Sequence, residues 1–420
     1  MSMLKISSEI GPLKTVIIHN PGKEIDTMVP DQMQELLFDD ILFGKEAREE
    51  LQLFRDILSL RAKVLDVQDL LMEAISSEAI KDQAFINLTN HLSLSQECQE
   101  ILKSYSPKEF SMALIEGIRN ETKKREKDGL FLLDPIPNLL FMRDPGFVFQ
   151  DKIFISSMFA KARVREPFIL KCIFTYHPEW KTEQQHFLDM HSQQSSPYFK
   201  RNRPSIEGGD VLILSKDLVC CGASQRTNRL GVESLVDSLR AESECKTLLI
   251  CEIMPNRAYM HLDTIFTQIN HEEFLVYPRL IGKEASQQIQ VYRIDLTKKG
   301  ISYEKRGGLI EALESEGFRV IAIDCGGKDE ISQQREQWTD ASNAFAMAPG
   351  VIFAYAHNVK TAEELSKAGY EIVTPEDFRK RSGSWVVDGS KKIVFQIWGN
   401  ELGRARGGPR CMTMPLEREW

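Results

Sequence analysis

The 420-residue sequence has no excess of basic residues, and this absence limits what the protein binds. Lysine and arginine together number 53 against 61 aspartates and glutamates, which gives a formal net charge of −8 at pH 7. A surface that binds the phosphates of a nucleic acid needs a basic excess. We therefore expect no nucleic-acid partner.

Long apolar runs are also missing. No stretch approaches the roughly 20 apolar residues that a membrane-spanning helix needs. The segment from Met1 to Ile17 has no basic region followed by a long apolar stretch, which is the pattern of a signal peptide. We expect a protein without a membrane partner that works in the cytoplasm.

The eight cysteines are scattered, and no two form a C-x-x-C pair, so neither a zinc ribbon nor a thioredoxin motif is supported. Most of them lie in apolar runs such as 248–251, where cysteine is usually a small core residue. Cys411 differs because it follows the polar, glycine-rich segment 406–410, which carries two arginines. Positive neighbours favour the reactive thiolate. Cys411 is therefore a candidate nucleophile, with an inert cysteine near a chain end as the alternative.

The residues that are present indicate a folded α/β protein. Hydrophobic residues make up 42% and charged residues 27% of the chain, which excludes disorder and coiled coils. Short apolar strands alternate with amphipathic helices, and the pattern recurs. The predicted strand–helix–strand units are 15–18, 45–61 and 64–67; 218–221, 230–239 and 247–251; and 351–355, 362–368 and 371–373, together with a helix at 309–316 before a strand at 320–323. Such recurrence favours repeated units that complete one core.

Residues 70–128 depart from this alternation, since they contain almost no strand pattern. Ser106 and Glu109 form a capping-box pattern around a proline at the first helical position. Phe110, Leu114 and Ile118 follow at helical spacing. We predict that residues 70–128 form a helical insertion within a single catalytic domain that spans residues 1–420.

Three further segments place titratable groups beside glycine, proline or a strand end. The run Arg143-Asp144-Pro145 ends an apolar stretch. It could be an ion pair that ends a helix or strand before a proline, or part of a functional site. In Glu207-Gly208-Gly209-Asp210 two glycines allow a sharp turn between carboxylates, and a plain turn is the alternative. We predict that His261 and Asp263 lie on one face of a strand. An acid or base beside a carboxylate and a structural histidine are equally compatible with this pattern.

Taken together, these segments resemble the arginine deiminase family. Six segments carry the resemblance in the family's order; they are Glu35–Asp40, Asn138 with Phe141–Pro145, Glu207–Asp210, Met260–Thr264, Arg335–Trp338 and Arg406–Met412. The resemblance implies the pentein fold, a five-bladed α/β propeller of ββαβ modules with a helical insertion. Two positions depart from the family, namely Met142, where many members have threonine, and the variable Arg410.

The resemblance implies that the protein hydrolyses L-arginine to L-citrulline and ammonia without a cofactor or metal. Cys411 would be the nucleophile and His261 the general acid and base, with Glu207 beside it. Asp144 and Asp263 would grip the guanidinium. Six residues would bind the amino-acid part of the substrate; they are Leu37, Asn138, Phe141, Arg163, Arg226 and Arg406. The three arginines would handle its carboxylate and the loop above it.

The chemistry explains why these residue types are needed. A guanidinium is planar with donors in a fixed fork, and carboxylates bind it through strong, directional pairs of hydrogen bonds. Its carbon is a poor electrophile, so a thiolate and a covalent thiouronium intermediate suit the reaction. In such a site, like-charge repulsion from Asp144 and Asp263 would raise the pKa of Cys411, and a bound cation would lower it. We therefore predict that the substrate assists thiolate formation.

Two other readings of the sequence remain open. Another guanidine-modifying enzyme of the same fold, an amidinotransferase or a methylarginine hydrolase, would use similar residues. An inactive arginine-binding protein would share the fold without turnover. The sequence does not fix the oligomeric state, and a homodimer or a homotetramer is compatible with it.

Overall fold

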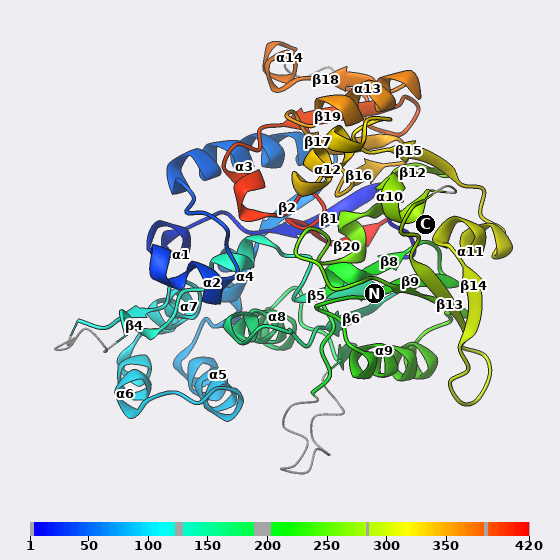
Figure 1. Ribbon diagram of the computed structural model, residues 1–420. Helices are drawn as coiled ribbons and strands as arrows, with labels where there is room; N and C mark the ends of the chain where they lie inside the picture. The colour runs from blue at the N-terminus through cyan, green and yellow to red at the C-terminus, as the bar shows by residue number, and fades with distance from the viewer. Residues whose placement is uncertain (1–3, 122–128, 189–202, 283–284, 382–384, 420) are drawn as a thin grey trace.

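The computed structural model describes residues 4–121, 129–188, 203–282, 285–381 and 385–419 (Figure 1). Among these residues the strands form five sheets of three to five strands and one two-stranded ribbon. The strands lie nearer the centre of the molecule, and most helices lie towards its outside (Figure 1). Within the described residues, no helix combines the length and the apolar character that crossing a membrane requires.

The strands group as follows. One sheet holds β2 (Lys63–Asp66), β1 (Leu13–Ile18) and β20 (Met414–Arg418), and a second holds β5 (Gly146–Phe149), β6 (Lys152–Ile155) and β7 (Gln185–Phe187). The third holds β14 (Glu304–Gly307), β13 (Gln290–Asp295), β10 (Thr247–Glu252), β9 (Leu218–Ala223) and β8 (Val211–Ile213). The fourth holds β11 (Phe266–Gln268), β12 (Glu273–Val276) and β15 (Ile321–Asp324). The fifth holds β16 (Phe345–Ala348), β17 (Val351–Tyr355), β19 (Ile393–Ile397) and β18 (Glu371–Val373), and the ribbon pairs β3 (Ile118–Arg119) with β4 (Phe131–Leu133).

Each of the five larger sheets combines an antiparallel pair with a parallel neighbour. In the second sheet β5 and β6 are antiparallel, and β7 then joins β6 in parallel. The third, fourth and fifth sheets repeat this order with β8–β9–β10, β11–β12–β15 and β16–β17–β19. In the first sheet the two ends of the chain meet, because β1 pairs with β20 antiparallel and with β2 in parallel. A parallel partner requires a crossover connection, and helices supply it.

The helices of the described residues are α1 (Lys23–Asp26), α2 (Met33–Leu36), α3 (Gly44–Leu58), α4 (Val67–Ala74), α5 (Glu78–His91), α6 (Gln96–Ser104), α7 (Pro107–Glu116), α8 (Arg165–Tyr176), α9 (Arg229–Glu242), α10 (Pro278–Ile281), α11 (Leu309–Ser315), α12 (Glu330–Trp338), α13 (Val359–Lys367) and α14 (Pro375–Lys380). The predicted strand–helix–strand units are confirmed, with α3, α9 and α13 as their helices. Their apolar faces pack on the sheets; Phe54 of α3, for example, meets the ring of Phe353 edge to face at 4.8 Å.

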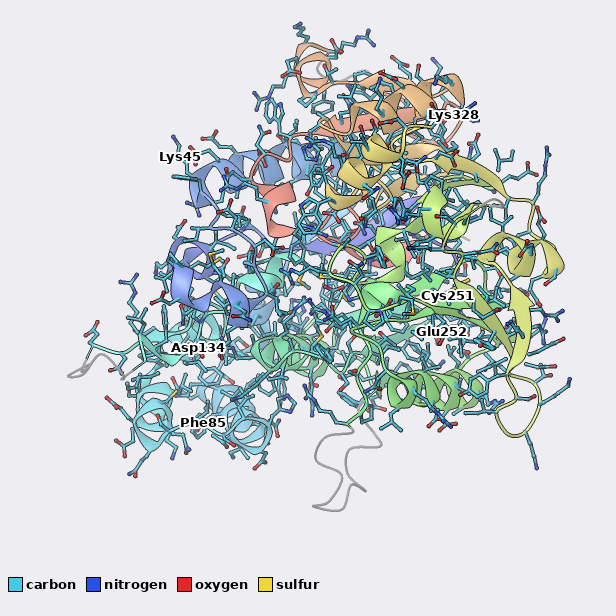
Figure 2. The ribbon with its side chains drawn as sticks, viewed as in Figure 1. Lys45, Phe85, Asp134, Cys251, Glu252 and Lys328 are labelled. Atoms are coloured by element: carbon cyan, nitrogen blue, oxygen red, sulfur yellow. The ribbon has the colours of Figure 1, made fainter. Side chains whose placement is uncertain are left out.

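Helices α4 to α7 form a group at the lower left of Figure 1, where the sequence predicts helices. Phe85 of α5, labelled in Figure 2, is 8% exposed within it. Helix α7 begins with the predicted capping box. The predicted continuation of its helical spacing to Ile118 is wrong, because the helix ends at Glu116 and Gly117 turns the chain into β3 at a φ of 78°. Residues 122–128 lie outside the described residues.

The turns that precede β5, β8, β11, β16 and β20, one strand from each of the five larger sheets, meet and form a ring. This ring is here called the five turns, which are residues 143–145, 207–210, 261–264, 340–344 and 408–413. Hydrogen bonds join each to the next. Gly208 N donates to Asp144 O, Leu262 N to Asp210 Oδ1, Asn343 Nδ2 to Asp263 O, Arg410 N to Asn343 O and Arg143 N to Cys411 O. Segments far apart in the sequence are thereby brought to one place.

We predict that removing the cap of α7 destabilises the protein locally. Ser106→Ala loses the hydroxyl that accepts from Glu109 N, so the free energy of unfolding should fall by about 1 kcal/mol in chemical denaturation. Ser93→Ala, at an exposed loop position between α5 and α6, is the control and should change little. Equal stabilities of the two variants would contradict the role of the cap.

Candidate active site

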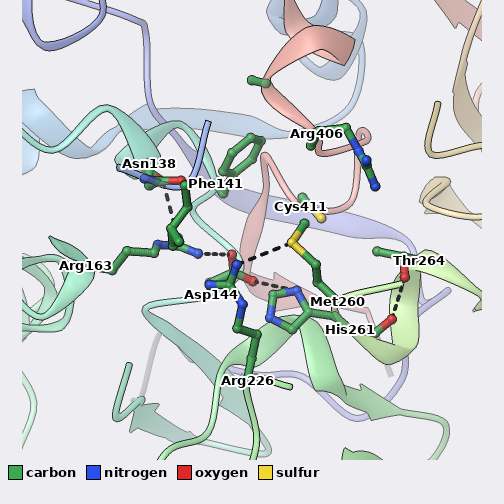
Figure 3. Close-up of a pocket in the computed structure, with 12 residues that line it drawn as sticks. Asn138, Phe141, Asp144, Arg163, Arg226, Met260, His261, Thr264, Arg406 and Cys411 are labelled. Atoms are coloured by element: carbon green, nitrogen blue, oxygen red, sulfur yellow. Dashed lines mark hydrogen bonds and ion pairs between the residues drawn. The ribbon is translucent and has the colours of Figure 1, made fainter. Parts of the chain in front are cut away.

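A small pocket opens at the five turns, and its lining includes most of the residues that the sequence singles out. The lining residues are Leu37, Asn138, Phe141, Asp144, Arg163, Arg226, Met260, His261, Thr264, Ala405, Arg406 and Cys411. Figure 3 shows Asp144, His261 and Cys411 converging in the middle of this pocket. Glu207 and Asp263, the two remaining predicted residues, lie directly behind the lining and contact His261 and Cys411.

Cys411 stands in the turn between the 3₁₀ helix η8 (Leu402–Ala405) and β20 and is 5% exposed. Its backbone N–H donates to Asn343 Oδ1 at 2.9 Å, and its Sγ lies 3.7 Å from Asp263 Oδ2. Burial raises the pKa of the thiol well above its usual value, and the charges of Asp263 and Asp144 raise it further. A positively charged group entering the pocket would favour the thiolate.

His261 lines the same pocket as Cys411 from another of the five turns and is 3% exposed. Its Nε2 lies 2.9 Å from Glu207 Oε2, and its Nδ1 lies 3.8 Å from Asp144 Oδ1. Burial lowers the pKa of His261, but the charge of Asp144 and the hydrogen bond to Glu207 outweigh this and raise it to about 9. The imidazole is therefore protonated at neutral pH, as a proton donor must be.

The glycine at position 209 allows this close packing. A Cβ added there would lie 2.6 Å from His261 Nδ1 and 2.9 Å from Asp144 Oδ1. Any side chain would displace one of the two groups, so the glycine belongs to the site rather than to a plain turn.

The predicted strand at 261–263 is wrong. His261 precedes a 3₁₀ helix, η7 (Leu262–Thr264), and β11 begins only at Phe266. The Thr264 hydroxyl donates to His261 O and favours the turn over an extended strand. His261 and Asp263 consequently project from a turn, and both still reach the pocket region.

Asp144 is already paired with a cation from the chain. Its Oδ2 accepts from Arg163 Nη1 at 2.7 Å, and Arg163 also bonds Glu166 through Nε and Nη2. Glu166 and Asp144 raise the pKa of Arg163 well above its usual value although burial lowers it. The structure thus brings Arg163, predicted at the substrate carboxylate, beside one of the acids.

Each acid nevertheless keeps one free oxygen. Asp144 Oδ1 and Asp263 Oδ1 are buried and have no hydrogen-bond partner among the described residues. An unpaired buried carboxylate oxygen is costly, and a planar cation with donors in a fork would satisfy both. This arrangement suits a guanidinium held beside the sulfur of Cys411.

The other predicted binding residues line the rest of the pocket. Asn138, in the 3₁₀ helix η2 (Pro137–Leu140), donates from Nδ2 to Leu36 O and so fixes the turn that carries Leu37. Arg226 reaches within 3.9 Å of Glu207 Oε2. Arg406, in a left-handed conformation with φ of 64°, stacks on the ring of Trp338 at 3.5 Å.

Sequence reasoning assigned no role to Met260, Thr264 or Ala405, which also line the pocket. Each adjoins or closely follows an assigned residue, and that adjacency was the available signal. It also left open the role of Arg410, which bonds Asp263 Oδ2 through Nη1 at 2.8 Å.

A metal could in principle use part of this site. Asp144, Glu207 and His261 each place a ligand atom within 4.8 Å of the others. A histidine binds a metal through its neutral form. The raised pKa of His261 opposes that form, and the ion pair with Glu207 already explains why the three groups converge.

Comparison with solved structures defines the class of protein. The chain resembles SxtG, an amidinotransferase from Microseira wollei in the saxitoxin biosynthetic pathway, with a TM-score of 0.55 and 12% identity over 100% of this chain and 98% of that one. At this identity the likeness shows the fold alone, which is the mixed α/β pentein fold.

The sequence comparisons identify the family. The family model described as arginine deiminase matches residues 34–418. Arginine deiminase of Treponema denticola is 34% identical over 100% of this chain and 99% of its own, and that of Clostridium perfringens is 36% identical over 99% and 98%. The chain belongs to the arginine deiminase family. It is an enzyme that hydrolyses L-arginine to L-citrulline and ammonia.

We predict that Glu207 keeps His261 protonated. In Glu207→Gln the pKa of His261 should fall from about 9 towards its ordinary value of 6.5, which an NMR titration of the imidazole measures. Because the pKa of His261 is higher in the folded protein than in the unfolded chain, the charged imidazole stabilises the fold. This contribution is fully present below pH 6.5 and is lost as the pH rises through about 9.

The matched control is Glu73→Gln, which removes a carboxylate from His177 in the same way but far from the pocket in sequence. It should leave the titration of His261 unchanged. A wild-type titration in Glu207→Gln would contradict the assignment.

Proposed function

We propose that Cys411 is the nucleophile of arginine hydrolysis and that Asp144, Glu207, His261 and Asp263 complete the catalytic machinery. The observation that carries this proposal is that the thiol, the imidazole and Asp144 line one pocket, with Asp263 directly behind the lining and in contact with the thiol. Each acid keeps an oxygen without a hydrogen-bond partner among the described residues. The guanidinium binds between Asp144 and Asp263, which sets its central carbon beside Sγ and makes burial of the charge tolerable.

The reaction then proceeds in two halves. The thiolate of Cys411 attacks the guanidinium carbon, and His261 protonates the departing nitrogen, which leaves as ammonia and gives a thiouronium. Water attacks this carbon while His261 takes one of its protons. The C–S bond then breaks, the second proton of the water passes to solvent, and citrulline and the thiolate are released. Glu207 orients the imidazole and favours its charged form.

The amino-acid part of the substrate binds at the other end of the pocket. We propose that Leu37, Asn138 and Phe141 line this end, since all three border the pocket. Arg163, Arg226 and Arg406 supply the positive charge that a carboxylate needs.

The larger architecture stays a proposal of the same kind. The five larger sheets and the five turns support a five-bladed propeller of ββαβ modules. The helices α4 to α7 support an insertion at 70–128 within one domain of residues 1–420. A homodimer or homotetramer and a cytoplasmic location complete the proposal.

Cys411→Ser should abolish citrulline formation, because a hydroxyl at this site is a far weaker nucleophile than a thiolate. We expect a loss of at least about 1,000-fold in kcat, while arginine still binds in isothermal calorimetry. Cys172→Ala, at a buried cysteine of α8, is the control and should keep turnover. Citrulline formation at the wild-type rate by Cys411→Ser would refute the proposed nucleophile, and dimethylamine release or amidino transfer would point to the alternative chemistries.

Substrate-assisted ionisation can be tested without turnover. L-Lysine carries a cation but no guanidino carbon, and its binding should lower the pKa of Cys411 and raise the ultraviolet thiolate absorbance relative to the Cys411→Ser protein. L-Norleucine, which has the same number of carbon atoms but no charge, should not. An unchanged absorbance with bound lysine would contradict substrate-assisted ionisation of Cys411.

A further inference from the structure

Behind the nucleophile lies a buried ion network that the proposed reaction does not use. Arg410, 1% exposed, donates from Nε to Glu9 Oε2 at 3.1 Å, from Nη2 to Glu9 Oε1 at 3.0 Å and from Nη1 to Asp263 Oδ2 at 2.8 Å. Its Nη2 also donates to Val211 O at 2.9 Å. The guanidinium therefore connects a carboxylate near the N-terminus with a carboxylate of the pocket.

The N-terminal segment is built to deliver Glu9 to this place. Lys5 N donates to Leu416 O, and Arg418 N donates back to Lys5 O, so the segment runs along β20. Ser8 Oγ then accepts from Gly11 N and turns the chain, and Glu9 also accepts from Ile213 N at 2.9 Å. Glu9 lies before residue 34, where the family match begins.

The positive charges around Glu9 require a balancing anion. Arg143 and Arg410 are buried and act on Glu9 with their charges. The sulfur of Cys411 lies 3.7 Å from Asp263 Oδ2, the same oxygen that Arg410 binds. Burial raises the pKa of Glu9, but the charges of Arg410 and Arg143 outweigh this and lower it to about 2. The carboxylate is thus ionised throughout the physiological range and balances the cations behind the thiol.

We propose that Glu9 and Arg410 are positioning residues for arginine hydrolysis: Glu9 clamps Arg410, and Arg410 fixes Asp263 through Oδ2 so that Oδ1 faces the substrate guanidinium beside Cys411. The two residues also set the charge felt by the thiol with opposite signs. This inference rests on the proposed roles of Cys411 and Asp263. It assigns to a residue outside the pocket, from the first dozen positions of the chain, an effect on the nucleophile.

Glu9 and Arg410 carry opposite charges, so removing them should shift the reactivity of Cys411 in opposite directions. A merely structural role would not produce opposite shifts. Glu9→Gln removes an anion behind Cys411, so the pH midpoint for alkylation of Cys411 by the neutral reagent iodoacetamide should fall. Arg410→Gln removes a cation, so the midpoint should rise; we expect shifts of about one pH unit. The kcat/KM for arginine should fall about 10-fold or more in both variants, because Asp263 loses its fixed orientation.

Two further variants complete the design. Arg410→Lys keeps the positive charge but cannot hydrogen bond Glu9 and Asp263 at once in the same geometry. The alkylation midpoint should therefore stay near the wild-type value, while kcat/KM should be as low as in Arg410→Gln. Glu273→Gln, on β12, removes a buried carboxylate that is paired with Lys392 and Tyr370. It should change neither the alkylation midpoint nor kcat/KM. If Arg410→Gln does not fold, Glu9→Gln and Arg410→Lys carry the test.

The outcomes separate this inference from the proposed site. Wild-type midpoints and kcat/KM in Glu9→Gln and Arg410→Lys would overturn the inference, as would midpoints that move in the same direction in Glu9→Gln and Arg410→Gln. If Cys411→Ser is inactive while these variants behave like Glu273→Gln, only the inference fails. If Cys411→Ser forms citrulline normally, the site assignment fails whatever the Glu9 variants do.

Discussion

The site depends on the hydrogen-bonded ring of the five turns. Each turn comes just before one strand of a different larger sheet, and each hydrogen bonds to the next. The side chain of Asn343 links two of the neighbouring turns, because it accepts from Cys411 N and donates to Asp263 O. The ring holds the thiol, the imidazole and the acids at fixed separations, which is what positioning catalysis requires.

The ring has an electrostatic cost that the surrounding arginines offset. Asp144, Glu207, Asp263 and Glu9 are all buried, and isolated buried carboxylates are strongly disfavoured. Arg163 pairs with Asp144 on one side of the pocket, and Arg410 pairs with Asp263 and Glu9 on the other. Each acid that faces the pocket keeps one oxygen free, so the same pairs that stabilise the fold leave acceptors for a cation.

The charge balance also explains the protonation states. Burial and the acids together raise the pKa of Cys411, and the acids raise that of His261 against the effect of burial, which leaves a neutral thiol and a charged imidazole at neutral pH. The arriving cation then shifts the thiol towards its reactive form. In the proposed reaction, one set of carboxylates therefore serves binding, proton donation and control of the nucleophile.

The amino-acid sequence alone determined the α/β alternation, the helices around residues 70–116 and the chemical types at the site, because apolar periodicity and motif spacing are local properties. The strand predicted at His261 failed, since a threonine hydroxyl and tertiary hydrogen bonds favour a turn there. The pairing of Arg163 with Asp144, the stacking of Arg406 on Trp338 and the clamp of Glu9 on Arg410 were decided only by the tertiary structure. These contacts join residues whose separation in the sequence ranges from 19 to 401 positions, and the last two depend on how strands far apart along the chain pair, which no local pattern encodes.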